Sequence, residues 1–323
     1  MKITALRNVL LAVLLSFPLL ACSHYDREIT LEVSDKYQLE QVMEVLCERL
    51  GNLPHSTLSC YKVERVAGSD NRILVSLGYN DDDKSKSLIE RTRTENLIRH
   101  VMTTEGRLEV YELYSNRECE GFITGVDELL TNATSFSAAD SAMLAGRQLS
   151  LSFILEPNSG TGFSYFADWK LLDKFHAIMS SDLSKQVLPS DLATRYSVQS
   201  DSIHPVSVYF IRKPEIPFDC NAHVVKYDLV SSEIYGNEIR VYFDEEGAKW
   251  FGRLTKSNVG SSLATAVDSD ILFDAKVVSE VPGGITSITC PNDPDRLRTK
   301  YAILKGGRYY TEVNIVEENK VKK

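Results

Sequence analysis

The apolar and polar residues at the start of the chain alternate first with period two and then with a helical period. Every second residue of Glu28–Val33 is apolar, which predicts a strand with one buried face. Across Leu39–Leu50 the apolar residues instead recur at intervals of three and four, which predicts a helix with one buried stripe. Ser34 is placed to cap this helix, and Gly51 is placed to end it.

Two more strands and a second helix follow in an order that defines a known arrangement. Ser59–Val66 and Arg72–Leu77 are strand candidates with turn-forming residues between them, so they predict a hairpin. A helix from about Lys84 to Met102 then leads into the strand Arg107–Tyr114. The order βαββαβ predicts a ferredoxin-like base over residues 28–114.

The rest of the chain predicts a second unit of mixed helices and strands. Residues 115–147 are rich in Ser, Thr, Asn and Ala, so they indicate a connection with at most one short helix, and a domain boundary. The expected fold class is therefore α+β, a ferredoxin-like base with an inserted α+β head. The later strands that we predict are Gln148–Leu155, Val206–Arg212, Glu238–Asp244, Leu263–Val267 and Ile271–Val278, with helices at Phe166–Met179 and after Asp244.

Composition excludes some classes of function. The chain has 323 residues, of which 43% are hydrophobic and 25% are charged, a balance typical of a globular protein with a packed core. Lys and Arg number 36 against 45 Asp and Glu, giving a net charge of -9. Removal of Lys2 and Arg7 with a leader would make the charge more negative still, by two. Because nucleic-acid binding needs a basic face, we expect no nucleic-acid partner.

The first residues have the layout of a secretory signal peptide. Two basic residues precede the short apolar run Val9–Leu15, and the segment closes on Leu19–Cys22. An uncleaved membrane helix is the alternative, but the run is shorter than the roughly 20 residues that span a bilayer, and Pro18 interrupts it. No later stretch is long and apolar enough to span a bilayer. We therefore expect the residues after Cys22 to form a soluble body in the cell envelope.

The residues before Cys22 resemble the lipobox of bacterial lipoproteins. In that family the cysteine thiol is diacylated, the leader is cut before the cysteine, and the new amino group is acylated. The resemblance implies a signal peptide over residues 1–21, a lipidated Cys22 and a tether over residues 22–27. Several acyl chains on one residue anchor a protein stably. The membrane is thus a predicted partner, and Ser23 after the cysteine favours the outer membrane.

The most specific motif lies between Ile239 and Thr289. A strand runs into a helix marked acidic-Gly-Ala-x-x-Phe and Leu-Thr, then an Asn-x-Gly turn, a hairpin and a Gly-Gly-x-x-x-Ile loop. This segment is similar to the head of the first periplasmic domain of the protein-export membrane protein SecD family. The resemblance implies a head over residues 148–291 and a return to the base over residues 292–323. The motif residues are Gly247, Ala248, Phe251, Leu254, Thr255, Asn258, Gly260, Gly283 and Gly284.

These residue types also have a physical explanation. Gly247 and Ala248 keep the start of the helix thin enough to approach the sheet, and Phe251 fills the core one turn later. Gly283-Gly284 permits backbone angles that other residues avoid. Departures from the family are Lys276, near which relatives carry a proline, and Cys290, where they carry a glycine.

The resemblance limits the function that can be expected. The family's proton-coupled work belongs to acidic residues inside the membrane, and this chain stops where the membrane-spanning bundle would begin. What the resemblance implies is a non-catalytic envelope protein that binds exported or unfolded polypeptide, or an envelope partner, in support of protein export. The alternative is a structural or interaction lipoprotein of an envelope complex unrelated to secretion.

No motif assigns catalytic, cofactor-binding or metal-binding residues. Gly160-Thr161-Gly162 lacks the third glycine of a dinucleotide loop and the Gly-Lys-Ser/Thr of a phosphate loop. Asp81-Asp82-Asp83 and Asp268-Ser269-Asp270 lack the glycine and distal glutamate of a calcium loop. We read all three as turns, and we expect no enzyme, although a hydrolase with a triad assembled in space stays a third class.

With Cys22 lipidated, five cysteines remain, so at most two disulfides can form in an oxidising envelope. Cys220 and Cys290 flank the motif-rich segment and are the candidate disulfide pair. Buried, reduced cysteine is the competing interpretation.

Overall fold

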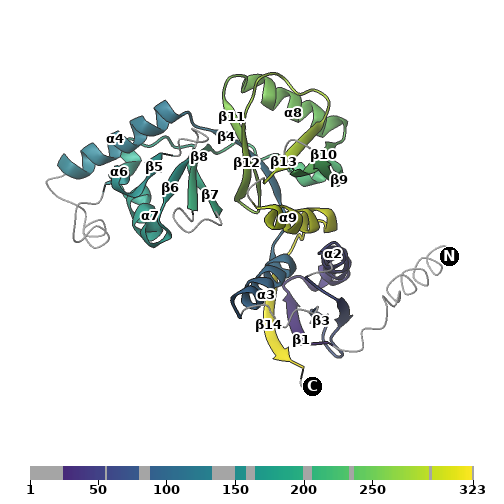
Figure 1. Ribbon diagram of the computed structural model, residues 1–323. Coiled ribbons are helices and arrows are strands. Elements are labelled where there is room, and N and C mark those ends of the chain that lie inside the picture. Colours follow the sequence, from purple (N-terminus) through teal and green to yellow (C-terminus); the bar gives the residue numbers. More distant parts are fainter. Residues whose placement is uncertain are drawn as a thin grey trace. The chain divides into compact units, whose positions relative to one another are not determined.

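The computed structural model describes residues 25–54, 57–79, 88–132, 150–157, 164–198, 206–232, 236–290 and 293–321 (Figure 1). The chain divides into two compact units. Unit 1 comprises Met1–Glu105 and Lys305–Lys323, and unit 2 comprises Gly106–Leu304. Both contain helices and strands, so the expected α+β class is confirmed.

Unit 1 is an antiparallel four-stranded sheet in the order β14-β1-β3-β2, against which α2 and α3 pack. Ile29, Leu31 and Val33 of the first strand are buried, as their alternation predicts. The strand and helix bounds in this unit are β1 (Arg27–Val33), η1 (Lys36–Gln38), α2 (Leu39–Gly51), β2 (Cys60–Arg65), β3 (Arg72–Gly78), α3 (Leu88–Thr103) and β14 (Val313–Lys320).

The order of strands is the ferredoxin-like one, but the fourth strand is not the one that the sequence predicts. Every residue pair between β1 and β14 is antiparallel, from Arg27 opposite Lys320 to Val33 opposite Val313. The predicted fourth strand, Arg107–Tyr114, was wrongly assigned to the base: it forms β4 (Leu108–Leu113) in unit 2. Consecutive elements are usually neighbours, and here they are not, because unit 2 is inserted between α3 and the strand that closes the sheet.

Unit 2 contains two sheets. The larger has the order β4-β11-β12-β7-β8-β6-β5, and β4 also pairs with β8. The bounds are β4 (Leu108–Leu113), α4 (Asn116–Asn132), α6 (Leu151–Ile154), β5 (Glu156–Pro157), β6 (Tyr165–Ala167), η2 (Trp169–Leu171), α7 (Leu172–Ser180), η3 (Ser184–Gln186), β7 (Leu192–Val198), β8 (Val206–Arg212), η4 (Cys220–His223), β9 (Val224–Ser232), β10 (Gly236–Phe243), α8 (Glu245–Ser257), β11 (Ser262–Val267), β12 (Asp270–Lys276), β13 (Ile285–Thr289) and α9 (Pro294–Gly306).

The extra pairing of β4 with β8 closes five strands into a ring, which separates two of the cores of unit 2. Side chains from each of these strands fill the ring, among them Tyr111, Ile211, Ala264 and Ile271. The alternate residues of β8, such as Phe210, face a second core that α4, α6 and α7 cover. Strand β8 is therefore buried on both faces.

The second sheet, β13-β10-β9, is antiparallel and carries α8 (Figure 1). Ile239, Val241 and Phe243 of β10 are buried, and the residues between them are less so. The predicted strand over Glu238–Asp244, the helix after it and the hairpin formed by β11 and β12 are all confirmed.

Three predictions in this unit are wrong, one of them in part: of the helix predicted over Phe166–Met179, Phe166 and Ala167 are in strand β6, and the helical turns begin at Trp169. Of the predicted strand Gln148–Leu155, residues 148–149 lie outside the described residues, and Leu151–Ile154 is helical. The carboxylate of Asp127 accepts hydrogen bonds from the backbone N–H of Leu151 (2.5 Å) and Ser152 (3.0 Å), and such a cap favours a helix. The connection predicted over residues 115–147 begins with the 17-residue helix α4, and unit 2 itself begins earlier, at Gly106.

Candidate functional site

The start of α8 is held by one acidic side chain. Asp244 is the N-cap, and its Oδ1 accepts a hydrogen bond from the backbone N–H of Gly247 at 2.8 Å. His223 Nδ1 lies 3.1 Å from the other carboxylate oxygen. The hydrogen bond from Gly247, followed by the one from His223, lowers the pKa of Asp244 below its usual value. The helix therefore begins at a carboxylate that stays ionised in mildly acidic solution.

Two glycines of the motif allow α8 to lie close to its sheet. A Cβ atom on Gly247 would sit 2.9 Å from the Cβ atoms of both His223 and Phe243. Gly284 has a φ of +65°, and a Cβ atom there would sit 2.6 Å from the Cβ of Ala248. The Gly284 carbonyl also accepts a hydrogen bond from Phe243 N–H at 2.8 Å. These motif residues thus meet where helix, strand and loop converge.

The end of α8 is fixed by the remaining motif residues. The Thr255 hydroxyl donates to the carbonyl of Phe251 (2.8 Å) and accepts from the N–H of Val281 (2.9 Å), which ties the loop to the helix. Asn258 donates through its side chain to the carbonyl of Leu254 at 2.9 Å. The next turn needs glycine, because Gly260 has a φ of +89°.

Gly283 differs from the other motif residues. It is exposed, its φ is not in the left-handed region, and a Cβ atom there would meet nothing within 4 Å. The predicted need for special backbone angles at Gly283-Gly284 therefore applies to Gly284. Nothing in the structure explains a glycine at position 283.

An aromatic stack beside α8 was not predicted from the sequence. The Phe218 ring lies parallel to the Trp250 ring, with centroids 4.2 Å apart, and its centroid lies 4.8 Å from that of His223. Phe218 belongs to the Pro-rich segment before η4, so the stack fastens that segment to the helix. A tryptophan next to the motif phenylalanine was the signal available in the sequence.

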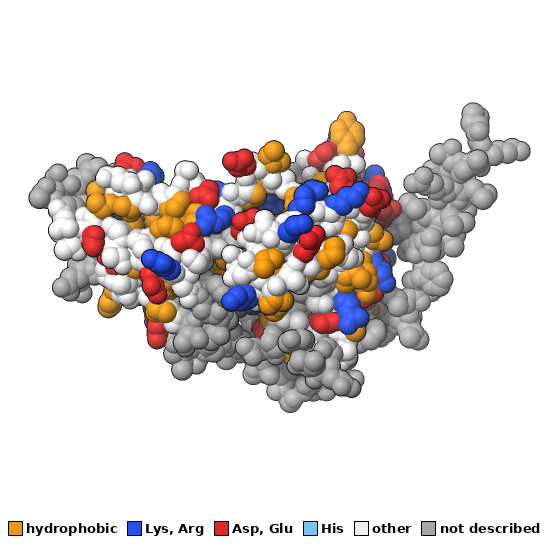
Figure 2. Space-filling view, turned by 90° about the horizontal axis from the view of Figure 1, so that it is seen from above, with side chains coloured by type: hydrophobic (Ala, Val, Ile, Leu, Met, Phe, Trp, Pro, Cys, Tyr) orange, Lys and Arg blue, Asp and Glu red, His pale blue; other side chains and the backbone are white. Residues whose placement is uncertain are grey.

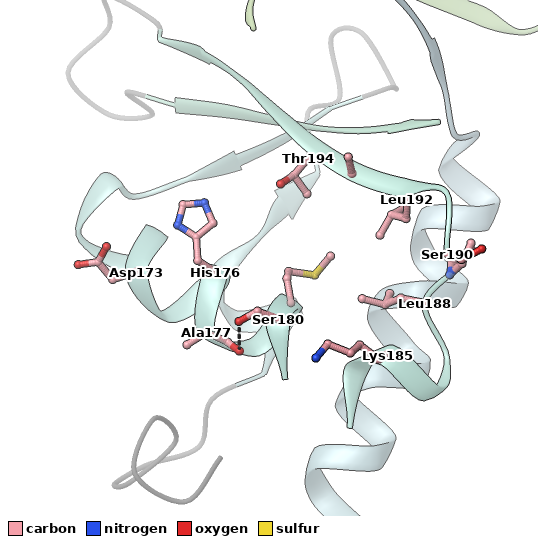
Figure 3. A pocket seen from close by; sticks show the side chains of 12 residues that line it. Asp173, His176, Ala177, Ser180, Lys185, Leu188, Ser190, Leu192 and Thr194 are labelled. Atoms are coloured by element: carbon pink, nitrogen blue, oxygen red, sulfur yellow. Dashed lines mark hydrogen bonds between the residues drawn. The ribbon is translucent and has the colours of Figure 1, made fainter. Parts of the chain in front are cut away.

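A groove elsewhere in unit 2 is the best candidate for a binding site. It has a cavity volume of about 770 Å³ and lies between α7, η3 and the start of β7 (Figure 3). Met179, Leu188 and Leu192 line it with apolar side chains, and His176 and Lys185 stand at its rim. Apolar walls with a few polar groups are typical of sites that bind organic ligands or peptide side chains.

The histidine and the lysine of the groove already have partners in the protein. His176 Nε2 forms a short hydrogen bond with the Tyr196 hydroxyl, which lies 3.2 Å from Thr194 Oγ1. Lys185 pairs with Asp182 at 2.7 Å. The groove therefore offers apolar contact area with a fixed polar edge, and no residue of it was singled out by a sequence motif.

The candidate disulfide between Cys220 and Cys290 is corrected by the structure, in which both are buried free thiols. The sheet register explains why. Cys220 lies just before Val224, which is opposite Phe243 at one end of β10, whereas Cys290 follows Thr289, which is opposite Glu238 near the other end. Five residues of strand span roughly 16 Å, well beyond disulfide reach. Cys47 and Cys119 are also free, and Cys60 is in a disulfide.

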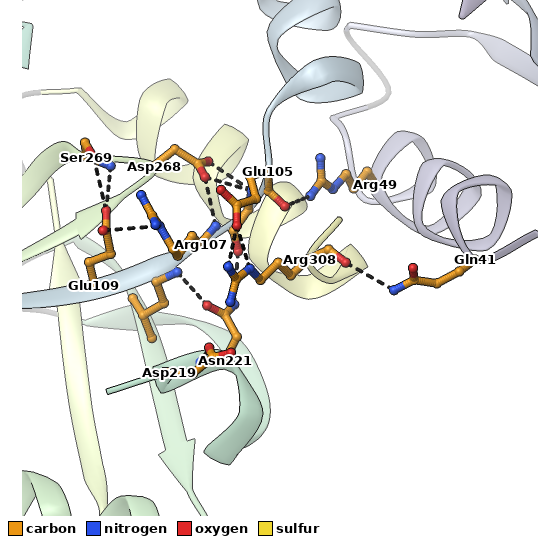
Figure 4. Close-up of polar contacts among 12 residues, drawn as sticks. Gln41, Arg49, Glu105, Arg107, Glu109, Asp219, Asn221, Asp268, Ser269 and Arg308 are labelled. Atoms are coloured by element: carbon orange, nitrogen blue, oxygen red, sulfur yellow. Dashed lines mark hydrogen bonds and ion pairs between the residues drawn. The ribbon is translucent and has the colours of Figure 1, made fainter. Parts of the chain in front are cut away.

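The Asp268-Ser269-Asp270 segment forms the predicted tight turn, and its oxygens are engaged by the protein. Asp268 and Ser269 have φ angles of 55° and 66°, as a tight hairpin turn requires. The Asp268 carboxylate accepts from the N–H groups of Gly106 and Arg107, both at 2.9 Å (Figure 4). Asp270 pairs with Arg296 and Lys300. The turn thus fixes the point where the chain enters unit 2.

Several other predicted features lie outside the described residues: Cys22 with the leader, Asp81-Asp82-Asp83 and Gly160-Thr161-Gly162. In the part of the chain that the structure describes, no helix combines the length and apolarity needed to span a membrane. The same residues contain no group of three His, Cys, Asp or Glu side chains suited to a metal ion.

Comparison with known proteins bears on the head. Residues 224–308 match the sequence model of the family described as SecDF, P1 head subdomain. All nine motif residues lie in this segment, so the resemblance predicted from residues 239–289 is confirmed there. The match begins at β9, and the groove at residues 173–194 lies outside it.

Two curated relatives are protein translocase subunits SecD. The one from Rhodothermus marinus is 31% identical over 90 residues, which are 28% of this chain and 14% of the relative. The one from Acidaminococcus fermentans is 30% identical over 83 residues, which are 26% of this chain and 20% of the relative. The matches therefore span no more than a fifth of the length of these relatives.

Solved structures of SecDF are also similar. A structure of SecDF described as a membrane component that enhances protein export covers 90% of this chain and 98% of its own, with 16% identity and a TM-score of 0.44. A structure of SecDF in a super-membrane-facing form covers 98% of this chain and 34% of its own, with 17% identity and a TM-score of 0.46.

Proposed function

From a chain that carries a SecD-type head at residues 224–308, we propose a non-catalytic, lipid-anchored cell-envelope protein that binds exported or unfolded polypeptide in support of protein export. The observation that carries this proposal is the family match over the head. The packing of Gly247 and Gly284 against neighbouring side chains supports the proposal. Each of these motif residues lies where a Cβ atom would clash, so the motif has a structural role in this fold. The protein takes its place in the envelope, facing the periplasm.

The groove supplies the contact surface in this proposal. Apolar side chains of an extended polypeptide would be buried against Met179, Leu188 and Leu192, which removes apolar area from water. Ser180 and Ser190 also line the groove; the Ser180 hydroxyl donates to the Ala177 carbonyl at 3.2 Å, and its oxygen can still accept from a backbone N–H. Apolar contacts that tolerate many sequences suit a partner that is recognised before it folds.

The anchor in this proposal is Cys22. Acylation at this residue would hold both units at a membrane surface, and Ser23 after the cysteine favours the outer membrane. Once the leader with Lys2 and Arg7 is removed, the net charge is more negative than -9 by two, which suits a body that is kept off an anionic lipid surface by its tether.

One observation favours the alternative, a structural lipoprotein of an envelope complex unrelated to secretion. The groove lies outside the segment that matches the SecD-type head, and the curated relatives match less than a third of the chain. In this alternative the chain keeps the SecD-type head fold, and the groove is a separate surface that binds one folded partner protein.

Crosslinking in living cells tests the two functions. A photoreactive residue is placed at Ser180 or Ser190 in the groove, and at Lys174, which is exposed on α7 but does not line the groove, as the matched control. The proposal expects many exported chains to be captured from the two groove positions and few from Lys174, with capture lost when export is blocked.

Two other outcomes are decisive. Capture of one folded envelope protein from the groove, unaffected by a block in export, would replace the proposed function with the alternative. Equal capture from Lys174 and from the groove positions would show that the groove does not select its partner.

A further inference from the structure

The outer strand of the head sheet has an edge that no other described strand covers, and a bulge at Val225 interrupts it near one end. Strand β9 has nine residues and lies at the end of the order β13-β10-β9, where β10 is its one strand partner among the described residues. Natural proteins usually blunt long, exposed edge strands, because their free backbone groups pair readily with another strand. Val225 is 67% exposed and Leu229 is 36% exposed on this edge, so it also carries uncovered apolar area.

The sequence of β9 is complementary to itself when it is reversed about Tyr227. Lys226 and Asp228 stand on either side of this residue, Val225 and Leu229 come next, and the valines at 224 and 230 lie beyond them. Two such strands in antiparallel pairing around Tyr227 would place Lys226 of each copy opposite Asp228 of the other. The same pairing would bring each Leu229 to the other copy's Val225, which lies in the bulge where the register of β9 with β10 shifts.

We propose that two copies of this chain pair through their β9 edges, antiparallel and centred on Tyr227, and so join two three-stranded sheets into one sheet of six strands. The contact is isologous, as in most symmetric dimers, because each copy contributes the same strand. This inference concerns the head sheet and does not depend on the proposed function.

Charge selects the centre of the pairing. A shift to Lys226 would set two lysines opposite each other, and a shift to Asp228 would set two carboxylates opposite each other, and like charges across strands are destabilising. The side chains of Lys226 and Asp228 are 51% and 38% exposed, so both can reach a second copy. In the single chain they are paired with each other at 2.7 Å, and they would exchange this bond for two bonds between copies.

The two faces of the sheet favour the same register as the charges do. Tyr227 lies opposite the buried Val241, on the face that carries α8, whereas Lys226 and Asp228 lie opposite Tyr242 and Arg240. A shift by one residue would bring the helix face of one copy against the polar face of the other. Pairing centred on Tyr227 keeps α8 of both copies on one side of the joined sheet.

Charge reversal of the full chain tests the proposal by sedimentation equilibrium over a range of protein concentrations. Lys226→Asp alone and Asp228→Lys alone each create two like-charge pairs, so each is expected to weaken the dimer at least tenfold. An equal mixture of the two variants restores opposite charges and is expected to form heterodimers. The double variant Lys226→Asp/Asp228→Lys is expected to dimerise as the unchanged chain does.

A matched control comes from the other outer strand with the same charge spacing. Lys62 pairs with Glu64 at 2.7 Å on β2, at the edge of the sheet in unit 1. Lys62→Asp is expected to leave the dimer unchanged, and far-UV circular dichroism checks that every variant is folded. An unchanged chain that stays monomeric at every concentration overturns the proposal, as does a dimer that is insensitive to both single reversals or sensitive to Lys62→Asp.

Discussion

Arg49 is the largest fully buried side chain in the described residues. Its guanidinium donates to backbone carbonyls at the end of α3 and before β14, including those of Thr104 (2.7 Å), Glu105 (2.9 Å) and Gly307 (2.6 Å). It also lies over the Tyr309 ring, 4.0 Å from the centroid. One side chain thus joins the two segments through which the chain leaves and re-enters unit 1 (Figure 4).

Replacement of Arg49 by Met is expected to lower the free energy of unfolding by about 3 kcal/mol, because the carbonyls would stay buried without their donor. Arg49→Lys should recover only part of the lost stability. The lysine ammonium is still a donor, but it lacks the planar, forked geometry of the guanidinium group. Urea titration followed by circular dichroism measures both. The control is Arg65→Met, which breaks an exposed pair with Glu40 and should cost less than about 0.5 kcal/mol.

Gly284→Ala is expected to cost about 2 kcal/mol, because alanine would have to adopt a left-handed φ and its Cβ would meet Ala248. Gly283→Ala, one residue earlier, should cost less than about 0.5 kcal/mol, since a Cβ atom there meets nothing within 4 Å. Thermal unfolding of the two variants provides the comparison. Equal losses would contradict the close contact between loop and helix.

At the scale of elements, the N-terminus of α8 makes the stability of the head depend on pH. The folded-state pKa of Asp244 is lowered, so its contribution is present above the unfolded value of about 3.9 and is lost as pH falls through the folded value. Asp244→Asn keeps a capping oxygen without the titration. Melting temperatures should therefore differ between the two proteins at pH 7 and converge below pH 4, whereas a constant difference would show that the carboxylate charge has no role.

Local patterns predict the elements of this chain better than they predict which elements are neighbours. The alternation of Ile29, Leu31 and Val33 and the cap at Asp244 depend on a few adjacent residues, and both are confirmed. The partner of β1 is a strand almost three hundred residues away, as shown by Val33 opposite Val313, and no short-range pattern encodes such a pairing.

The candidate groove was beyond sequence reasoning for a related reason. Its walls come from α7, η3 and β7, and β7 was not predicted as a strand. Met179 and Leu192 look like ordinary core residues until the fold leaves them beside a cavity. Arg49 shows the same limit, because an arginine in an amphipathic helix normally faces water and its backbone acceptors leave no trace in the sequence. The family motif could be recognised from the sequence because several of its residues are glycines, which are needed where the backbone lies too close to its neighbours for a side chain.

At the scale of the whole molecule, charged and apolar side chains are interspersed over the face seen in Figure 2, as on an ordinary soluble surface. If Cys22 is acylated as proposed, attachment to a membrane is expected to depend on this lipid. Cys22→Ala should abolish labelling by radioactive palmitate and release the protein from the membrane fraction, because the acyl chains supply the binding energy.

The control for the anchor is Cys47→Ala, which removes a partly buried free thiol and should leave both labelling and membrane attachment unchanged. Mass spectrometry of the N-terminal peptide without reduction gives an independent result. An unacylated Cys22, or one held in a disulfide, would show that the lipobox resemblance is misleading.

The pairing of β1 with β14 determines when unit 1 can fold during synthesis. The sheet needs residues 313–320 beside residues 27–33, so its contacts have a very high sequence separation. The inserted unit 2 has all of its strands by Thr289 and can reach its native pairing first. Until β14 has been synthesised, the backbone N–H and C=O groups on one edge of β1 have no strand partner, and we expect this edge to be a chaperone-binding site. Unit 1 is therefore expected to complete its sheet only after unit 2 has formed, because its first strand has to wait for β14.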